Sequence, residues 1–292
     1  MREFVYAVTE EEEGWKVERV LSSRLLLSRK RISSLKFSGG IFLCGMNTHT
    51  DRRVKEGDTV SVFLPDGEDL PKPFFLPLDI AYEDEDLLVI SKPAPLPSVR
   101  SSLPDPHTLE NAVYAYLGCP DTFTFRPVNR LDKGTSGLMV CAKNAHAQYL
   151  LQKTLHTPSF IRKYLAVTDG APAEDEGEIH LPIARSGEGT RRHISEDGKM
   201  SVTRYRMLEK NERHALLLLE LETGRTHQIR VHMQATGCPV TGDYLYGTEH
   251  PLLPGRFALH SCYVSFIHPV TGKNVELESP LPGELRQVFE ET

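Results

Sequence analysis

A polar turn followed at once by a short apolar run occupies residues 127–144 (PVNRLDKGTSGLMVCAKN). Glycine permits positive φ, and Thr or Ser hydroxyls bond nearby backbone, so residues 134–137 predict a tight, well-held bend. The apolar residues 138–142 predict a buried strand. Arg130 and Asp132 would then lie beside a rigid corner, which is a suitable place to present a carboxylate for chemistry. The same two residues also fit a surface ion pair next to a turn.

Three sequence blocks in this order resemble the RluA-type family of RNA pseudouridine synthases. The blocks are RLD at 130–132 with TSGL at 135–138, KYLAV at 163–167, and GRTHQIRVH at 224–232. Asn129 stands where that family usually has histidine, and family-like sequence spans roughly residues 80–280. The resemblance implies an enzyme that isomerises uridine in RNA to pseudouridine.

The resemblance also implies roles for individual residues. Asp132 would be the catalytic aspartate, and Arg130 would enter the RNA when the target base leaves its stack. Tyr164 would pack against that base and handle a proton, while Leu131 and Ile229 would line the substrate pocket. Arg225 would lie against Asp132. Because Asn129 does not replace the carboxylate, we expect activity to survive this departure.

The expected reaction breaks a carbon–nitrogen glycosidic bond, turns the uracil and joins the same sugar carbon to a ring carbon. It needs no redox change, so we expect no cofactor. In every version of the chemistry the carboxylate must be ionised, which a nearby guanidinium favours where water is excluded. We therefore expect Arg225 to be the counter-ion of Asp132.

The first 64 residues have a composition of their own. Residues 15–62 hold ten Lys/Arg and four acids, a net charge of +6, which leaves −12 for the rest of a chain whose total is −6. Helical spacing between residues 15 and 35, with Ser28 as an N-cap, followed by a small hairpin, resembles an RNA-binding module of a ribosomal small-subunit protein. Five basic residues would then be available for phosphate contacts: Arg24, Arg29, Lys30, Arg31 and Lys36.

Proline density predicts an extended linker at residues 65–77 (PDGEDLPKPFFLP). We therefore expect a small N-terminal helical RNA-binding module at 1–64 and a catalytic domain at 78–292. The fold class expected for the catalytic domain is α+β, with helices around a mixed, mostly antiparallel sheet.

The five cysteines are scattered and form no C-x-x-C pair, which indicates reduced thiols. The first residues do not show the basic-then-apolar pattern of a leader, so we expect none, and no apolar run approaches the length of a membrane span. We expect a cytoplasmic monomer whose partner is ribosomal or transfer RNA.

Other interpretations remain open at this stage. Asp132 with Glu222 or Asp243 resembles the carboxylate pair of a glycosidase, which would release free uracil. The chain also fits an RNA-binding or assembly factor without activity. His227, His232 and Cys238 suggest a metal only weakly, because on an expected strand the two histidines would face apart or lie too far from each other, so we expect no metal.

Overall fold

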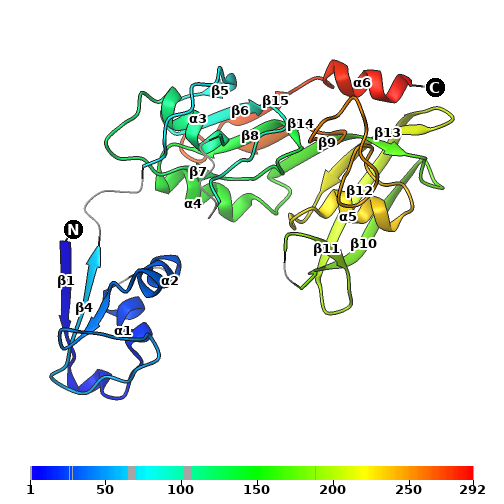
Figure 1. Ribbon diagram of the computed structural model, residues 1–292. Coiled ribbons are helices and arrows are strands. Elements are labelled where there is room, and N and C mark those ends of the chain that lie inside the picture. Colours follow the sequence, from blue (N-terminus) through cyan, green and yellow to red (C-terminus); the bar gives the residue numbers. More distant parts are fainter. Residues whose placement is uncertain are drawn as a thin grey trace. The chain divides into compact units, whose positions relative to one another are not determined.

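The structure is a computed structural model that describes residues 2–25, 27, 29–64, 70–101, 107–187 and 189–291. The side chains of Arg2, Lys30 and Leu64 are outside this description. The chain forms two compact units, Met1–Leu70 and Pro71–Thr292 (Figure 1). The expected cap Ser28, the Lys30 side chain and residues 65–69 of the expected linker lie outside the described residues.

The first unit contains a small antiparallel sheet and two short α-helices. Its strands follow the spatial order β1-β4-β2-β3. The elements are β1 (Arg2–Ala7), the 3-10 helix η1 (Glu10–Glu12), α1 (Val17–Ser23), α2 (Arg29–Ser38), β2 (Ile41–Leu43), β3 (Met46–Asn47) and β4 (Thr59–Leu64).

The apolar residues of these helices and strands meet in one core. Val20 and Leu21 of α1, Leu35 of α2 and Val60 and Val62 of β4 are all buried there. The helical spacing between residues 15 and 35 therefore predicted both helices correctly, and each helix buries one apolar stripe against the sheet.

The second unit is built on one large sheet. The described strands are β5 (Asp79–Glu83), β6 (Leu87–Lys92), β7 (Arg126–Pro127), β8 (Ser136–Ala142), β9 (Phe160–Asp169), β10 (Glu176–Arg185), β11 (Arg192–Ile194), β12 (Lys199–Lys210), β13 (His214–Leu221), β14 (Leu259–Ile267) and β15 (Asn274–Glu278). The described helices are α3 (Leu109–Tyr116), α4 (Ala145–Thr154), α5 (Gln228–Ala235) and α6 (Gly283–Glu290).

The strand order is β11-β10-β12-β13-β9-β14-β8-β6-β5, with β15 paired to β14 and β7 paired to β8. Among the described strands, β14 and β8 run parallel and the other paired neighbours run antiparallel. The expected α+β class with a mixed, mostly antiparallel sheet is confirmed. Figure 1 shows α4 beside β7 and β8, and α5 beside β10, β11 and β12.

Side-chain caps mark the starts of two of these helices. The Thr108 side chain accepts a hydrogen bond from the backbone of Asn111 at the start of α3, and the Asn144 side chain accepts one from Ala147 at the start of α4. Such caps satisfy amide groups that have no partner within the helix. Each helix therefore begins directly after its capping residue.

Part of the expected linker packs against the second unit. Phe74 and Leu76 lie against its main apolar cluster. The Lys72 carbonyl accepts a 2.6 Å bond from Asn111 Nδ2, and the Phe74 amide donates to the Asn111 carbonyl at 3.3 Å. Residues 71–77 therefore belong to the second unit, because Phe74 and Leu76 pack against its apolar cluster.

The parallel contact between β8 and β14 depends on Gly137. This residue has φ +101°, and a Cβ built on it would lie 2.2 Å from the Ser261 carbonyl oxygen. Only glycine combines this backbone conformation with such an approach. The contact fixes the corner that precedes β8, and Asp132 lies in the loop just before it.

Candidate active site

Backbone hydrogen bonds hold the loop that carries Asp132. Ser98 Oγ donates to the Leu131 carbonyl at 2.6 Å, and the Leu96 amide donates to the Lys133 carbonyl at 2.9 Å. The Thr135 amide bonds back to the Asp132 carbonyl at 3.1 Å. The rigid corner expected from the sequence is therefore present, and the Asp132 side chain is 26 % exposed at its tip.

A buried lysine supports the same loop from beneath. Lys92 Nζ donates to the carbonyls of Leu96 at 2.8 Å, Pro93 at 3.0 Å and Lys133 at 3.5 Å. Burial lowers the pKa of Lys92 to about 7, although the negative charge of Asp132 opposes this shift. The lysine thus ties together two segments that are far apart in the sequence.

Asn129, which departs from the family pattern, has a structural part in the same loop. It is 5 % exposed, and its side-chain oxygen accepts a 2.8 Å bond from the Val140 amide of β8. This bond fastens the start of the loop to the strand that follows it. Asn129 therefore acts on the backbone, three residues before the carboxylate of Asp132.

The ion-pair partner of Asp132 is Arg230. Nη1 of Arg230 lies 2.9 Å from Oδ2 of Asp132, while Nε and Nη2 bind Asp243 at 2.6 and 2.8 Å. Burial lowers the pKa of Arg230, but the bonds and charges of Asp243 and Asp132 outweigh it and raise the pKa overall. The guanidinium, 2 % exposed, therefore stays charged between two carboxylates.

The prediction that Arg225 is this counter-ion is wrong in its choice of residue. Arg225 lines the same pocket as Asp132 but is exposed, and it lies in the loop before α5. Arg230 lies within the helix, on a turn that faces the carboxylate. Both arginines belong to the same sequence block, and the start of the helix decides which of them reaches Asp132.

An aromatic ring also packs against the guanidinium of Arg230. The Phe257 ring centre lies 4.1 Å from the guanidinium carbon. A Cβ on Gly134 would lie 2.6 Å from an atom of that ring, so the glycine expected only for its turn also makes room for Phe257. Stacking and two carboxylates together hold the guanidinium in one orientation.

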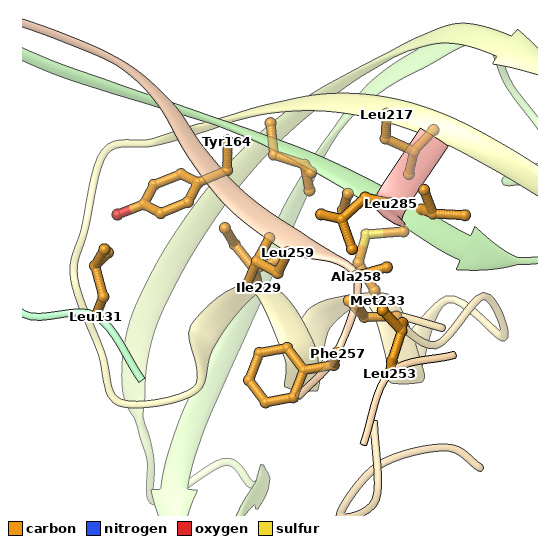
Figure 2. Close-up of a cluster of buried hydrophobic side chains, with 14 of the residues drawn as sticks. Leu131, Tyr164, Leu217, Ile229, Met233, Leu253, Phe257, Ala258, Leu259 and Leu285 are labelled. Carbon is orange, nitrogen blue, oxygen red and sulfur yellow. The ribbon is translucent and has the colours of Figure 1, made fainter. Parts of the chain in front are cut away.

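The other pocket walls carry the side chains that the sequence predicted. Leu131, Tyr164 and Ile229 are buried and line the pocket around Asp132, which is open to solvent on one side. Figure 2 shows Tyr164 and Leu131 at one end of the apolar cluster, with Ile229 and Leu259 next to them. Burial raises the pKa of Tyr164, so its hydroxyl stays protonated at neutral pH. A pocket that combines apolar side chains with charged and polar groups suits a flat base that carries hydrogen-bonding edges.

His227 faces the carboxylate from the start of α5. Its Nε2 lies 3.8 Å from Asp132 Oδ2, and its Nδ1 is 2.8 Å from the Tyr246 hydroxyl. Burial lowers the pKa of His227, which opposes the effect of Asp132 and keeps the ring neutral at neutral pH.

The metal alternative finds no support in the geometry of these histidines. The segment expected as a strand is the helix α5, with His227 at its N-cap. His232 bonds to Thr203 and to the Leu181 carbonyl, away from His227. In the part of the chain that the structure describes, metal-ligand spacing occurs only at Asp84, Asp86 and His268, and hydrogen bonds already hold that group.

The glycosidase alternative lacks a second free carboxylate. Asp243 is fully buried and bound by two bonds from Arg230, so it cannot face a substrate. Glu222 is exposed and pairs with Arg204. Asp132 is therefore the carboxylate that the pocket presents.

The basic residues expected to contact RNA differ in their surroundings. Arg130 is exposed at the rim of the pocket, and Arg29 and Lys36 are exposed on α2. Arg31, also on α2, is half-buried. Arg24 is occupied, because its guanidinium pairs with Glu12 at 2.6 Å and Glu11 at 3.3 Å. Contact between Arg24 and phosphate stays a prediction, since the residue is exposed but its guanidinium already has two acidic partners.

Comparisons with known proteins agree with this site. Residues 86–235 match the family described as RNA pseudouridylate synthase. The chain is 35% identical to the uncharacterized RNA pseudouridine synthase YlyB of Bacillus subtilis, over 99% of this chain and 98% of that protein. It is 36% identical to ribosomal large subunit pseudouridine synthase D of Zymomonas mobilis, over 97% and 95%.

Solved structures show the same fold. Human RNA pseudouridylate synthase domain containing 1 superposes with a TM-score of 0.56 at 30% identity, covering 70% of this chain and 83% of the human chain. A second human protein, domain containing 4, gives a TM-score of 0.57 at 24% identity, covering 71% and 93%, and supports the fold.

The chain belongs to the RNA pseudouridine synthase family, as the three sequence blocks predict. It is an RNA-modifying isomerase that forms pseudouridine from uridine.

Proposed function

We propose that this enzyme isomerises uridines of large-subunit ribosomal RNA, with Asp132 as the catalytic carboxylate. The observation that carries the catalytic part is the single accessible carboxylate of the pocket, paired with Arg230 and placed beside Tyr164 and Ile229. The ribosomal target is supported by relatives such as the Zymomonas mobilis protein, whose name specifies the large ribosomal subunit.

The role of Asp132 depends on its charge. Whether it adds to the sugar or base or assists loss of the sugar 2′ proton, the oxygen must carry its negative charge inside a pocket that excludes water. Arg230 stabilises the negative charge of Asp132 by donating a hydrogen bond to it. Arg230 itself stays protonated because the two carboxylates raise its pKa. Asp243 fixes the guanidinium so that little reorganisation is needed during the reaction.

The target base must leave its stack before it reaches this pocket. Unstacking costs a few kcal/mol, and a flat cation that fills the gap recovers part of that cost. Arg130 is exposed at the pocket rim, two residues before Asp132. We assign Arg130 to this position in the RNA.

The first unit is assigned to RNA binding, as in the ribosomal small-subunit module that its sequence resembles. Arg29 and Lys36 are exposed on α2, where they are available to phosphate. Because such contacts release counterions, affinity should fall steeply with salt.

A cytoplasmic enzyme is consistent with two observations. All five cysteines are free thiols, as expected in a reducing compartment. No helix within the described residues has the length and apolar character needed to cross a bilayer.

Mapping of pseudouridine in cells that lack this protein tests the target. We expect one or more large-subunit ribosomal positions to lose the modification, and wild-type protein but not Asp132→Asn to restore it. A loss confined to transfer RNA would refute the ribosomal assignment. Restoration by Asp132→Asn would refute the catalytic role and favour an RNA-binding factor.

A further inference from the structure

Arg162, on β9, is a buried cation without a carboxylate partner. It is 5 % exposed, and its Nε finds no hydrogen-bond acceptor. Its Nη2 donates to the Leu155 carbonyl at 3.2 Å and lies 3.4 Å from His156 Nδ1. Within the described residues no acid forms an ion pair with it, although a buried charge is costly unless it is paired.

A second arginine lies close to this buried cation. Arg225 follows Gly224, and a Cβ on Gly224 would lie 3.3 Å from Arg162 Nη1 and 2.9 Å from His156 Cε1. Burial lowers the pKa of His156, and the charges of Arg162 and Arg225 lower it further. Arg162 on β9 and Arg225 in the loop before α5 therefore both lie near the imidazole of His156.

Nearby acids are already occupied by another arginine. Arg204 binds Glu178 through its Nε at 2.5 Å and pairs with Glu222 through its Nη2. Glu220 adds to the negative charge around Arg204. These acids therefore stabilise Arg204 and leave the charge of Arg162 uncompensated.

The uncompensated charge lies next to the catalytic pocket. Arg162 and Tyr164 are two residues apart on β9, so both side chains lie on the buried face of that strand. Tyr164 and Arg225 both line the pocket that contains Asp132. An anion bound by the two arginines would thus lie beside a base held against Tyr164.

We propose that Arg162 and Arg225 form a binding site for a phosphate group of the RNA backbone adjacent to the target uridine. This inference rests on the proposed RNA substrate and gives Arg225 a binding role instead of the expected pairing with Asp132. A phosphate held by Arg225 would attract the nearby Arg162 guanidinium and compensate its buried positive charge. Arg225, which is exposed, closes over the phosphate from the rim.

The test uses single neutral linkages in the substrate. The probe is a synthetic stem-loop that contains whichever uridine the wild-type enzyme converts in total RNA from cells lacking it. Each phosphate near this uridine is replaced in turn by an uncharged methylphosphonate, and Kd and single-turnover rate are measured. The proteins are wild type, Arg162→Gln, Arg225→Gln and the control Arg204→Gln, whose arginine is bound by acids.

For wild type and Arg204→Gln we expect one methylphosphonate to weaken binding about tenfold, the scale of one charged hydrogen bond. The same replacement should change the Kd of Arg162→Gln and Arg225→Gln less than twofold, because the partner of that phosphate is already lost. The slope of log K against log salt should also fall by about 1 in both variants.

A purely structural role for Arg162 gives a different result. Arg162→Gln would then bind RNA more weakly yet lose the same further factor as wild type at every methylphosphonate, which overturns the proposal. Arg225→Gln guards against misfolding of the buried variant, since its side chain is exposed. A converted uridine in transfer RNA would refute the ribosomal target and leave this phosphate test intact.

Discussion

Nη1 of Arg230 lies 2.9 Å from Oδ2 of Asp132, although the two residues are 98 positions apart in the chain. The opposite edge of the same guanidinium binds both oxygens of Asp243. This arrangement gives Asp132 a counter-ion whose own orientation is held by Asp243. Asp243 thus acts on Asp132 through Arg230 and is a positioning residue.

Arg230→Lys should slow the reaction much more than it weakens binding. Lysine keeps the positive charge but cannot bind two carboxylates in the same plane, so the support of Asp132 is lost. We expect the single-turnover rate to fall about 10²–10³-fold, as for loss of one oriented donor, with Kd changed less than about threefold. Stopped-flow tritium release and filter binding measure the two quantities.

Arg225→Met is the matched comparison for that variant. It removes the other arginine of this pocket, and that arginine does not pair with Asp132. It should weaken RNA binding and leave the single-turnover rate at saturating enzyme within about threefold of wild type, an order-of-magnitude expectation for lost uniform binding. If Arg225→Met loses most of its rate and Arg230→Lys stays active, then Arg225 is the counter-ion of Asp132, as the sequence predicted.

Arg130→Ala should depend on the structure of the RNA. If Arg130 fills the gap left by the target base, its loss matters most where stacking must be broken. We expect turnover to fall at least about tenfold more on a stable stem-loop than on a variant with mismatches around the uridine. Equal losses on both RNAs would exclude a role in base flipping.

Gly137→Ala should destabilise the second unit severely. The new Cβ would lie 2.2 Å from the Ser261 carbonyl oxygen, so β8 and β14 would have to separate. We expect a loss above about 4 kcal/mol in urea unfolding, or insoluble protein. The control Gly272→Ala also has positive φ but no atom within 4 Å, and should cost about 1–2 kcal/mol.

His260 should make the protein less stable in mild acid. Its Nε2 faces the Ser279 carbonyl at 3.3 Å, which can only accept, so in the neutral ring Nε2 donates and Nδ1 accepts from Ser136 Oγ at 2.9 Å. Burial lowers the pKa of His260 to about 4. The unfolded chain therefore binds more protons than the folded one between about pH 6.5 and 4, and stability falls as pH decreases through this window.

The contribution of His260 is at most about 3.5 kcal/mol, because its pKa is lowered from 6.5 to about 4 and each pKa unit is about 1.4 kcal/mol. Urea unfolding of wild type and His260→Gln at pH 6.5 and 4.5 isolates it from the other titrating groups. The variant should lose less stability between the two pH values than wild type. Identical losses would mean that His260 does not drive the acid sensitivity.

Exposed cations of the first unit should set part of the salt dependence of RNA binding. Arg29→Gln and Lys36→Gln should each reduce the slope of log K against log salt by about 1 if each contacts a phosphate. Arg286→Gln is the control, because Arg286 is bound to Glu209 in the second unit. An unchanged slope in both test variants would remove the first unit from RNA binding.

The sequence alone determined features that depend on local chemistry. The apolar run of β8 and the glycine-rich turn before it each act within a few residues. The motifs were sufficient to identify Asp132, Tyr164, Leu131 and Ile229 as one pocket, and the structure brings these four together. These features can be predicted from the sequence without knowing which distant segments pack against them.

The helix α5 shows where a local pattern misleads. Ile229, Val231 and Met233 alternate as in a strand, but residues 228–233 are all buried, including Arg230 and His232. A helix that is enclosed on every side has no polar face, so its period of 3.6 residues cannot be read from apolar spacing. The sequence therefore gave strand periodicity to a buried helix.

Only the tertiary structure decided which arginine pairs with which carboxylate. Arg225 and Arg230 lie in one motif, and only the fold turns Arg230 toward Asp132 and Asp243 while leaving Arg225 near Arg162. Ion pairing depends on distances of a few ångströms between segments far apart in the chain, and on which acids are already occupied. Residue types and spacing carry the identity of the enzyme, but the allocation of its charges appears only after the strands and α5 have packed.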